Sequence, residues 1–260
     1  MSTNPIDQGS VTLSRNAAVA TITFSHPLSN SLPGKLLDLL ATMITEEGLS
    51  NESKVMVLKS GGDRAFCGGA SFDELAAIDN DKNGLQFFSG FAKVINAMRT
   101  CPKFIIGRVH GKAVGGGVGI ASATDYCFAT QFASVKLSEL AVGIGPFVVG
   151  PAVERKIGSN AMSQLAIDAT NFRTASWAAS NGLYAEVFDD VEALDAGVER
   201  LTNSLSGQSM DAMKALKKVF WQGTDHWGEL LLERAAISGS LVLRPEAKAA
   251  IAHIKSQLGG

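Results

Sequence analysis

The sequence is poor in the features that mark several common classes of protein. Charged residues make up 18% of the 260 residues and the formal net charge is −2, so nothing attracts the chain to nucleic acid or to an anionic membrane. The three cysteines, Cys67, Cys101 and Cys127, are widely spaced, and we expect buried free thiols in a reducing compartment. The four histidines are scattered without zinc-type spacing, so we predict no metal site.

Long apolar runs are also lacking. The longest, residues 141–153, is interrupted by glycine and proline and is too short to cross a bilayer. The N-terminal segment is polar and contains Asp7, unlike a secretory signal. With 46% apolar residues the composition is that of a globular protein, and we expect a cytoplasmic one with neither a nucleic-acid nor a membrane partner.

Strands and helices alternate through the first half of the sequence. Apolar and polar residues alternate over 11–24 around Arg15–Asn16, which predicts a β-hairpin. A further strand is expected over 134–142. Helices and short buried strands are predicted in turn at 33–47, 54–59, 83–98, 103–110 and 115–123. This order is typical of an α/β protein with a mostly parallel sheet.

From residue 149 onward the pattern is almost entirely helical. The predicted helices cover 149–156, 161–169, 175–181, 192–205, 209–221, 229–240 and 245–257. The change of pattern near residue 195 is the only plausible boundary, so we divide the chain into a core of residues 1–195 and a helical region of residues 196–260.

Two glycine-rich turns each follow a predicted strand or turn and could start a helix. They are "AFCGGASFDEL", residues 65–75, and "HGKAVGGGVGIASATDY", residues 110–126. Amides at a helix start have no intrahelical acceptor and carry partial positive charge. Two such turns side by side would form an oxyanion hole for an enolate. Neither turn has the spacing of a phosphate- or dinucleotide-binding loop.

Glu139 is the acidic residue best placed for proton transfer. In a strand over 134–142 it would share one face with apolar residues, and poor solvation would raise its pKa towards that of a useful acid/base. The alternative is a structural carboxylate paired with a lysine or an amide. Asp73 and Glu74 are expected to begin a helix, Asp125 to hold a loop or helix end, and His110 to be a hydrogen-bonded turn residue.

Four blocks of the sequence, in order, resemble the enoyl-CoA hydratase/isomerase (crotonase) superfamily. "AFCGGASFDEL" is similar to its AF-x-x-G-A-D-x-x-E-L signature, and "HGKAVGGGVGIASATDYCFAT" to its glycine-triplet block. "ASVKLSELAVGIGPFVVGPAVERKIG" and "DATNFRTASWAASNGLYAEVFDD" resemble the two blocks that follow. The resemblance implies a crotonase-like spiral of ββα units, a C-terminal helical trimerisation region, and a homotrimer or a hexamer built as a dimer of trimers.

The resemblance also implies roles for individual residues. The two oxyanion amides correspond to Gly68 and Gly116, and the second catalytic glutamate corresponds to Glu139. The first catalytic glutamate corresponds to Gly119, so it is missing. The substrate would be an acyl-CoA, with coenzyme A as part of the substrate and no separate cofactor. Its binding residues would be Ser29, Ala65, Gly69, Ala70 and Lys255, with Lys248 as a further candidate for the CoA phosphates.

The missing first glutamate leaves the reaction open. A single glutamate at the second position is what Δ3,Δ2-enoyl-CoA isomerases of the superfamily use. The glycine at position 119, the "LSE" around Glu139 and the glycine- and proline-containing run that ends in "IG" nevertheless resemble bacterial 3-methylglutaconyl-CoA hydratase-like members. We therefore expect hydration of a 2-enoyl-CoA, with isomerisation as the alternative. A non-catalytic acyl-CoA-binding scaffold is a further alternative from a different class.

Overall fold

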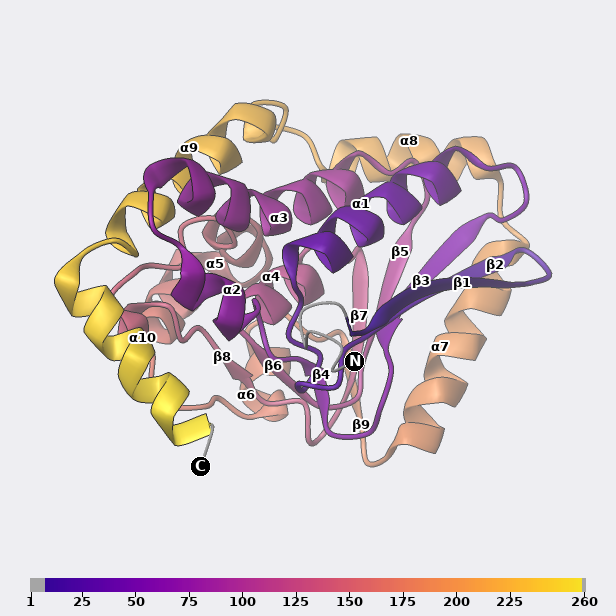
Figure 1. The fold of residues 1–260 in the computed structure, drawn as a ribbon. Coiled ribbons are helices and arrows are strands. Elements are labelled where there is room, and N and C mark those ends of the chain that lie inside the picture. Colours follow the sequence, from indigo (N-terminus) through magenta and orange to yellow (C-terminus); the bar gives the residue numbers. More distant parts are fainter. Residues whose placement is uncertain (1–7, 259–260) are drawn as a thin grey trace.

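The structure, a computed structural model, describes residues 8–258 and contains two β-sheets surrounded by helices (Figure 1). The larger sheet has the strand order β1-β2-β3-β5-β7-β9, in which only β1 runs antiparallel to its neighbour. The smaller, parallel sheet has the order β4-β6-β8. The strands are β1 (Ser10–Asn16), β2 (Val19–Ser25), β3 (Val55–Ser60), β4 (Ala65–Cys67), β5 (Ile105–Val109), β6 (Lys112–Val114), β7 (Tyr126–Thr130), β8 (Val135–Lys136) and β9 (Glu186–Phe188).

The helices occupy nearly the predicted segments. They are α1 (Gly34–Leu49), α2 (Phe72–Ala77), α3 (Asp81–Thr100), α4 (Gly116–Ser122), α5 (Gly150–Ile167), α6 (Ala175–Ser180), α7 (Val191–Ser206), α8 (Met210–Phe220), α9 (Trp227–Leu241) and α10 (Pro245–Leu258), with a 3₁₀ turn η2 (Leu140–Val142). The two helices predicted at 149–156 and 161–169 are both present. They lie within α5, which is interrupted at Gly158, where φ of 77° and ψ of 160° are not helical. None of the helices within residues 8–258 has the length and apolar character needed to span a membrane.

Successive strand pairs build a spiral of ββα units. In the pairs β3/β4, β5/β6 and β7/β8, the first strand joins the large sheet and the second joins the small one, and helical segments follow each pair. This arrangement confirms the predicted α/β class and the ββα repeat. Because β4 and β6 are adjacent and parallel, the two glycine-rich turns that follow them lie at the same end of the small sheet.

The large sheet is buried on both faces, which explains its nearly continuous apolar strands. Met56 and Leu58 of β3 pack in one core cluster with α1, α3 and α4. Val55 and Val57 of the same strand point the other way, into a cluster with α7 and α8. Figure 1 shows α1 and α3 on one side of the sheet and α7 on the other. The first cluster also contains Phe66, Ala113 and Val135 of the small sheet, so the same core holds this sheet against the large one.

Two local predictions are wrong. The predicted hairpin exists, but its turn is at Ala17–Ala18, where Ala17 has a φ of 49°. The strand expected over 134–142 ends at Lys136, because its partner β6 stops at Val114 and the chain turns into α4. Glu139 itself has helical dihedrals, φ −63° and ψ −39°, and begins η2.

The predicted division at residues 195/196 lies inside α7, which packs against β5, β7 and β9. The C-terminal helix α10 returns to pack against α2 and η2 (Figure 1). The division into a core and a helical region therefore does not coincide with a break between elements, and it stays a prediction, as does the trimer or hexamer.

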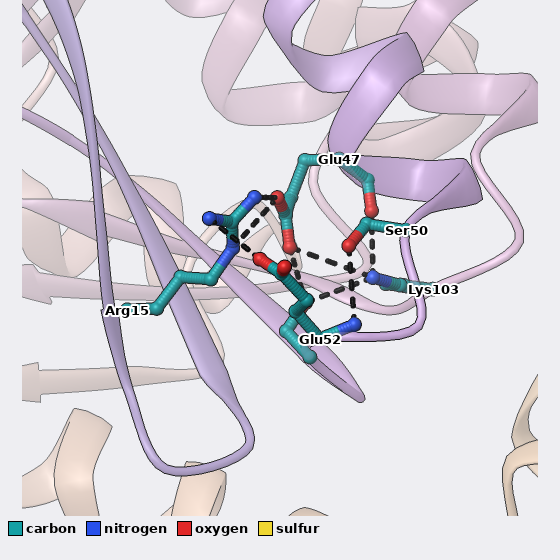
Figure 2. Close-up of polar contacts among 6 residues, drawn as sticks. Arg15, Glu47, Ser50, Glu52 and Lys103 are labelled. Atoms are coloured by element: carbon teal, nitrogen blue, oxygen red, sulfur yellow. Dashed lines mark hydrogen bonds and ion pairs between the residues drawn. The ribbon is translucent and has the colours of Figure 1, made fainter.

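A buried carboxylate, Glu47, ties α1 to the hairpin and to the segment before β5 (Figure 2). Its side chain is fully buried, Arg15 donates to Oε2 at 2.6 Å, and Ser53 donates to Oε1 at 2.6 Å. The buried Lys103 ammonium lies 3.6 Å from Oε1. Burial alone would raise the pKa of Glu47, but the hydrogen bonds and the neighbouring cations outweigh it and lower the pKa. Glu47 is therefore a paired, structural carboxylate.

Candidate active site

The glycine triplet supplies one backbone donor to the site. Gly115 has a φ of 51°, a conformation that favours glycine, and α4 begins at the next residue. A Cβ atom on Gly116 would overlap the ring of Phe91, and one on Gly117 would lie 2.6 Å from the Cys67 carbonyl oxygen. Glycine is required by this close packing. At the first position of α4, the Gly116 amide has no acceptor within residues 8–258.

The prediction that Gly68 is the second oxyanion donor is wrong. The Gly68 amide donates to the carbonyl oxygen of Ser29 at 2.9 Å, so it is not available to a substrate. The strand-like segment after it bonds to Leu32 through the Gly69 carbonyl, at 2.8 Å, and the Ser71 amide, at 3.2 Å.

Ala70 carries a free amide that the sequence analysis did not single out as a candidate donor. Backbone groups alternate in direction along an extended segment, so the Ala70 amide points away from Leu32. That direction is the side of β4 on which β6 lies, and β6 leads into the Gly116 turn. In the described part of the chain the Ala70 amide has no acceptor. Ala70 and Gly116 both line one cavity, and their free amides can serve as the donor pair.

Glu139 is placed beside this pair. A Cβ atom on Gly115 would lie 3.0 Å from its Oε1, while Oε2 is enclosed and lacks a hydrogen-bond partner among the described residues. Burial raises the pKa of Glu139 to about 7. In contrast to Glu47, Glu139 has no salt-bridge partner in the described part of the chain, and only its own backbone amide opposes the effect of burial on its pKa. No pairing with a lysine therefore supports the structural alternative. The raised pKa was predicted from a position on the face of a strand, and this position is wrong, because Glu139 lies at the start of the turn η2.

The cavity beside Glu139 is small and apolar. Its volume is about 90 Å³, and within residues 8–258 Glu139 is the only ionisable residue that lines it. Two hydroxyl side chains, of Ser138 and Ser238, also reach the wall. Aromatic rings form much of the remaining surface, from Phe72, Phe87, Phe88, Phe91 and Phe147. The cavity therefore offers an apolar space beside the amides of Ala70 and Gly116.

Gly119, the position of the missing glutamate, has no space for a side chain. A Cβ atom there would lie 2.5 Å from Cγ1 and 2.7 Å from Cβ of Val149. Val149 is 4% exposed and lines the cavity. The absence of the first carboxylate is therefore accompanied by an apolar side chain that fills its place.

The predicted CoA-binding residues fall into three groups. Ser29 and Ala65 line a second depression, which also contains Arg64, whereas Gly69 and Ala70 line the acyl cavity. Lys255 pairs with Asp73 of α2 at 2.8 Å. The Lys248 ammonium donates to the carbonyl oxygen of Ile78. A role of these residues in binding CoA stays a prediction.

Asp125 has the structural role predicted for it. Its carboxylate accepts hydrogen bonds from the Ile105 amide at 2.7 Å, from Lys217 at 2.8 Å and from the Trp221 indole at 2.9 Å. These bonds tie α8 to the start of β5. Both carboxylate oxygens of Asp125 are thus occupied by hydrogen bonds within the protein, and Asp125 does not line the cavity beside Glu139, so it is not a candidate for catalysis.

Asp73, Glu74 and His110 do not line the cavity beside Glu139. Ser71 caps α2, and Glu74 in its first turn accepts a hydrogen bond from the Gly34 amide at 2.8 Å. The prediction that His110 is hydrogen-bonded is wrong for its side chain, because neither ring nitrogen has a partner within residues 8–258. Its burial lowers the pKa of His110, which favours the neutral ring.

The family model for enoyl-CoA hydratase/isomerase matches residues 14–235. The chain belongs to this family. A short-chain-enoyl-CoA hydratase of Clostridium acetobutylicum is 28% identical over 84% of the chain and 83% of the relative. A peroxisomal Delta(3,5)-Delta(2,4)-dienoyl-CoA isomerase of Arabidopsis thaliana is 29% identical over 74% of the chain and 73% of the relative. In general terms, the family makes this protein an enzyme of enoyl-CoA hydration or isomerisation.

The fold has close structural relatives in the family. The crystal structure of an enoyl-CoA hydratase from Bacillus halodurans matches with a TM-score of 0.86 and 21% sequence identity, over 94% of this chain and 99% of that chain. Another enoyl-CoA hydratase, from Mycobacterium avium subsp. paratuberculosis, matches with a TM-score of 0.83 and 21% identity, over 95% and 96% of the two chains. At this identity the likeness establishes the fold alone.

The raised pKa of Glu139 predicts a pH-dependent effect on stability. In the folded protein the pKa is about 7, above the ordinary 4.5, so folding disfavours the ionised form and stability is lost as the pH rises between these values. The difference in free energy of unfolding between Glu139→Gln and wild type should therefore shift in favour of the variant by about 3 kcal/mol when the pH is raised from 4 to 8. Urea unfolding at both pH values measures this. A difference independent of pH would contradict the burial of an ionisable carboxylate.

Proposed function

We propose that the protein acts on a 3-enoyl-CoA whose acyl chain is short and uncharged. It shifts the double bond to the 2-position, with Glu139 as its single acid/base. The observation that carries this proposal is that Glu139 is the only ionisable group lining the cavity, in the part of the chain that the structure describes. The resemblance alone favoured hydration. The geometry favours isomerisation, because Val149 fills the place at Gly119 of the missing first glutamate, which commonly shares the proton transfers of hydration with the glutamate at position 139.

The proton path needs only one carboxylate. Ionised Glu139 takes a proton from C2 of the substrate, and the electrons move into the thioester carbonyl to form a dienolate. The amides of Ala70 and Gly116 stabilise the negative oxygen. Protonated Glu139 then returns the proton to C4, which leaves the double bond between C2 and C3. A pKa of about 7 suits both steps, because neither protonation state is strongly disfavoured at neutral pH.

Hydration of a 2-enoyl-CoA is the second candidate. The Ser138 hydroxyl lines the same cavity next to Glu139 in the sequence and could help to hold a water molecule there. Glu139 would then take a proton from that water and relay it to C2. The relative named a short-chain-enoyl-CoA hydratase is consistent with this reaction.

Product analysis separates the two candidates. Purified protein is incubated with 3-pentenoyl-CoA and, separately, with crotonyl-CoA. We expect 2-pentenoyl-CoA from the first and little 3-hydroxybutyryl-CoA from the second. Rapid hydration of crotonyl-CoA without isomerisation would favour the second candidate. No turnover of any enoyl-CoA, with acyl-CoA binding intact, would instead support the non-catalytic alternative.

The cavity wall also predicts which acyl groups are rejected. Within residues 8–258 its lining contains no lysine, arginine or histidine, and the one charged group is the Glu139 carboxylate. An acyl chain with a terminal carboxylate, as in 3-methylglutaconyl-CoA, would lose its hydration without gaining a counter-charge. We expect glutaryl-CoA to bind at least about 100-fold more weakly than pentanoyl-CoA, which carries a methyl group in place of the carboxylate.

Isothermal titration calorimetry with a matched pair of variants tests whether the missing counter-charge causes this weaker binding. Phe87 is half-buried and lines the cavity, so Phe87→Arg introduces a cation, while Phe87→Leu removes the ring without adding charge. Only Phe87→Arg should reduce the ratio of the dissociation constants of glutaryl-CoA and pentanoyl-CoA, because only this variant supplies a cation for the terminal carboxylate. If wild type bound glutaryl-CoA and pentanoyl-CoA equally well, the prediction that the site selects an uncharged acyl chain would be wrong.

A further inference from the structure

Val149 closes the wall of the acyl cavity at the point where a side chain from α4 would enter. It precedes α5 and is held in place on both sides, since the Gly150 amide donates to the Pro146 carbonyl at 2.8 Å and the Val153 amide donates to the Val149 carbonyl at 3.0 Å. Its side chain occupies the space next to Gly119, so close that even a methyl group there would collide with it. Val149 and Gly119 are therefore a packed pair.

The consequence for water follows from what this wall offers. A water molecule in a cavity needs room and two to four polar partners. The Val149 side chain supplies no polar group, and Gly119 supplies no side chain at all. The Gly119 amide is already bonded to the Gly115 carbonyl at 3.3 Å. A nucleophilic water is therefore not held at the Val149 wall, and the hydrophobic side chain takes up the volume it would need.

We propose that Val149 is a specificity-determining residue: by filling the space at Gly119 it keeps water away from the 2-enoyl thioester that Glu139 has formed, so that the product leaves without being hydrated. This inference rests on the proposed isomerase function and concerns the fate of the 2-enoyl product while it is still bound. If water reached the site, its oxygen would add to C3 of the 2-enoyl product while a proton went to C2, giving a 3-hydroxyacyl-CoA. When water is excluded, release of the 2-enoyl-CoA is the remaining outcome.

Two substitutions test whether Val149 excludes water. Val149→Ala opens space without adding a polar group, and Val149→Thr adds a hydroxyl at nearly constant volume. Each is incubated with 3-pentenoyl-CoA in ¹⁸O-labelled water, and the ratio of labelled 3-hydroxypentanoyl-CoA to 2-pentenoyl-CoA is measured. The ratio is compared at the same low conversion of 3-pentenoyl-CoA in each protein, so that a change in overall rate does not alter it. We expect it to rise at least about tenfold in one or both variants, which corresponds to about 1.4 kcal/mol between the two transition states.

A ratio unchanged in both variants would overturn the proposal, and so would hydration as the main reaction of wild type. Failure of the proposed function is recognised separately. Exchange of the C2 protons of pentanoyl-CoA in D₂O reports enolate formation by Glu139 in the absence of any double bond. Wild type that shows neither exchange nor turnover would contradict the proposed function.

Thermal unfolding tests the packing of the pair even in an inactive protein. Gly119→Ala should lower Tm by about 3–10 °C, because the added methyl group overpacks against Val149. In the double variant Gly119→Ala, Val149→Ala, most of this loss should be recovered relative to Val149→Ala alone. If Gly119→Ala leaves Tm unchanged, Val149 does not fill the space and the inference is wrong.

Discussion

Replacing Glu139 with Gln is expected to lower kcat for 3-pentenoyl-CoA by about 10²–10⁴-fold, the usual contribution of a positioned acid/base. The amide has nearly the same shape but does not take a proton from C2. The effect should be large because no other ionisable group lines the cavity within residues 8–258. Steady-state kinetics with both proteins, together with acyl-CoA binding to show that the site is intact, measures it.

Glu74→Gln is the matched control. Glu74 is a half-buried carboxylate outside the acyl cavity that accepts a hydrogen bond from the Gly34 amide, and Gln preserves an acceptor there. This variant should keep near-wild-type activity. If Glu139→Gln retained the wild-type rate, the proton transfer would have to be assigned elsewhere and the proposed function would fail with it.

The same carboxylate determines the pH profile. A base acts in its ionised form, so kcat/KM of wild type should rise with pH and level off above a pKa of about 7, well above the ordinary value of 4.5 for glutamate. The burial of Oε2 without a partner is the physical reason. An acidic limb near pH 4.5 would show that the carboxylate is solvated in the working enzyme.

Ala70→Pro is expected to lower kcat by about 10²–10³-fold, the typical cost of losing one oxyanion donor. Proline removes the Ala70 amide hydrogen, which makes no hydrogen bond within the described residues, so no fold-stabilising bond is broken. Ala70→Ser keeps the amide and adds only a small side chain at a partly exposed position, and it should retain most of the activity.

Binding of pentanoyl-CoA and the thermal unfolding midpoint of each variant separate a lost donor from a disturbed turn. Ala70→Pro should bind this ground-state ligand nearly as well as wild type, because the donor matters most when the oxygen becomes charged. If Ala70→Pro retained full kcat, the second donor would have to come from another amide of the 68–70 turn.

Part of this site could be predicted because local chemistry is visible in the sequence. A run of glycines before an apolar helix requires close backbone packing, and the structure places Phe91 and the Cys67 carbonyl where side chains on Gly116 and Gly117 would lie. A glutamate among apolar residues predicted a poorly solvated carboxylate, and Glu139 has one enclosed oxygen without a partner. Both features depend on residue type and short-range spacing.

Other parts depended on contacts between distant segments. The choice of Gly68 over Ala70 failed because the Gly68 amide is taken by Ser29, some forty residues earlier. A strand was expected through Glu139, but β8 ends where its partner β6 turns into α4. Buried carboxylates also look alike in sequence: Glu47 is neutralised by Arg15 and Lys103, whereas Glu139 faces a cavity.

The sequence by itself determined the α/β class and the glycine turns. It also predicted Glu139 as the carboxylate for proton transfer and Gly119 as the position at which the first glutamate of the family is missing. These follow from backbone conformational limits and from the cost of burying a charge, which are properties of single residues and their neighbours. Only the tertiary structure decided which amides remain free, what buries Glu139 and that Val149 fills the space at Gly119. Each of these depends on which hydrogen-bond acceptor or side chain a distant segment brings to the same place.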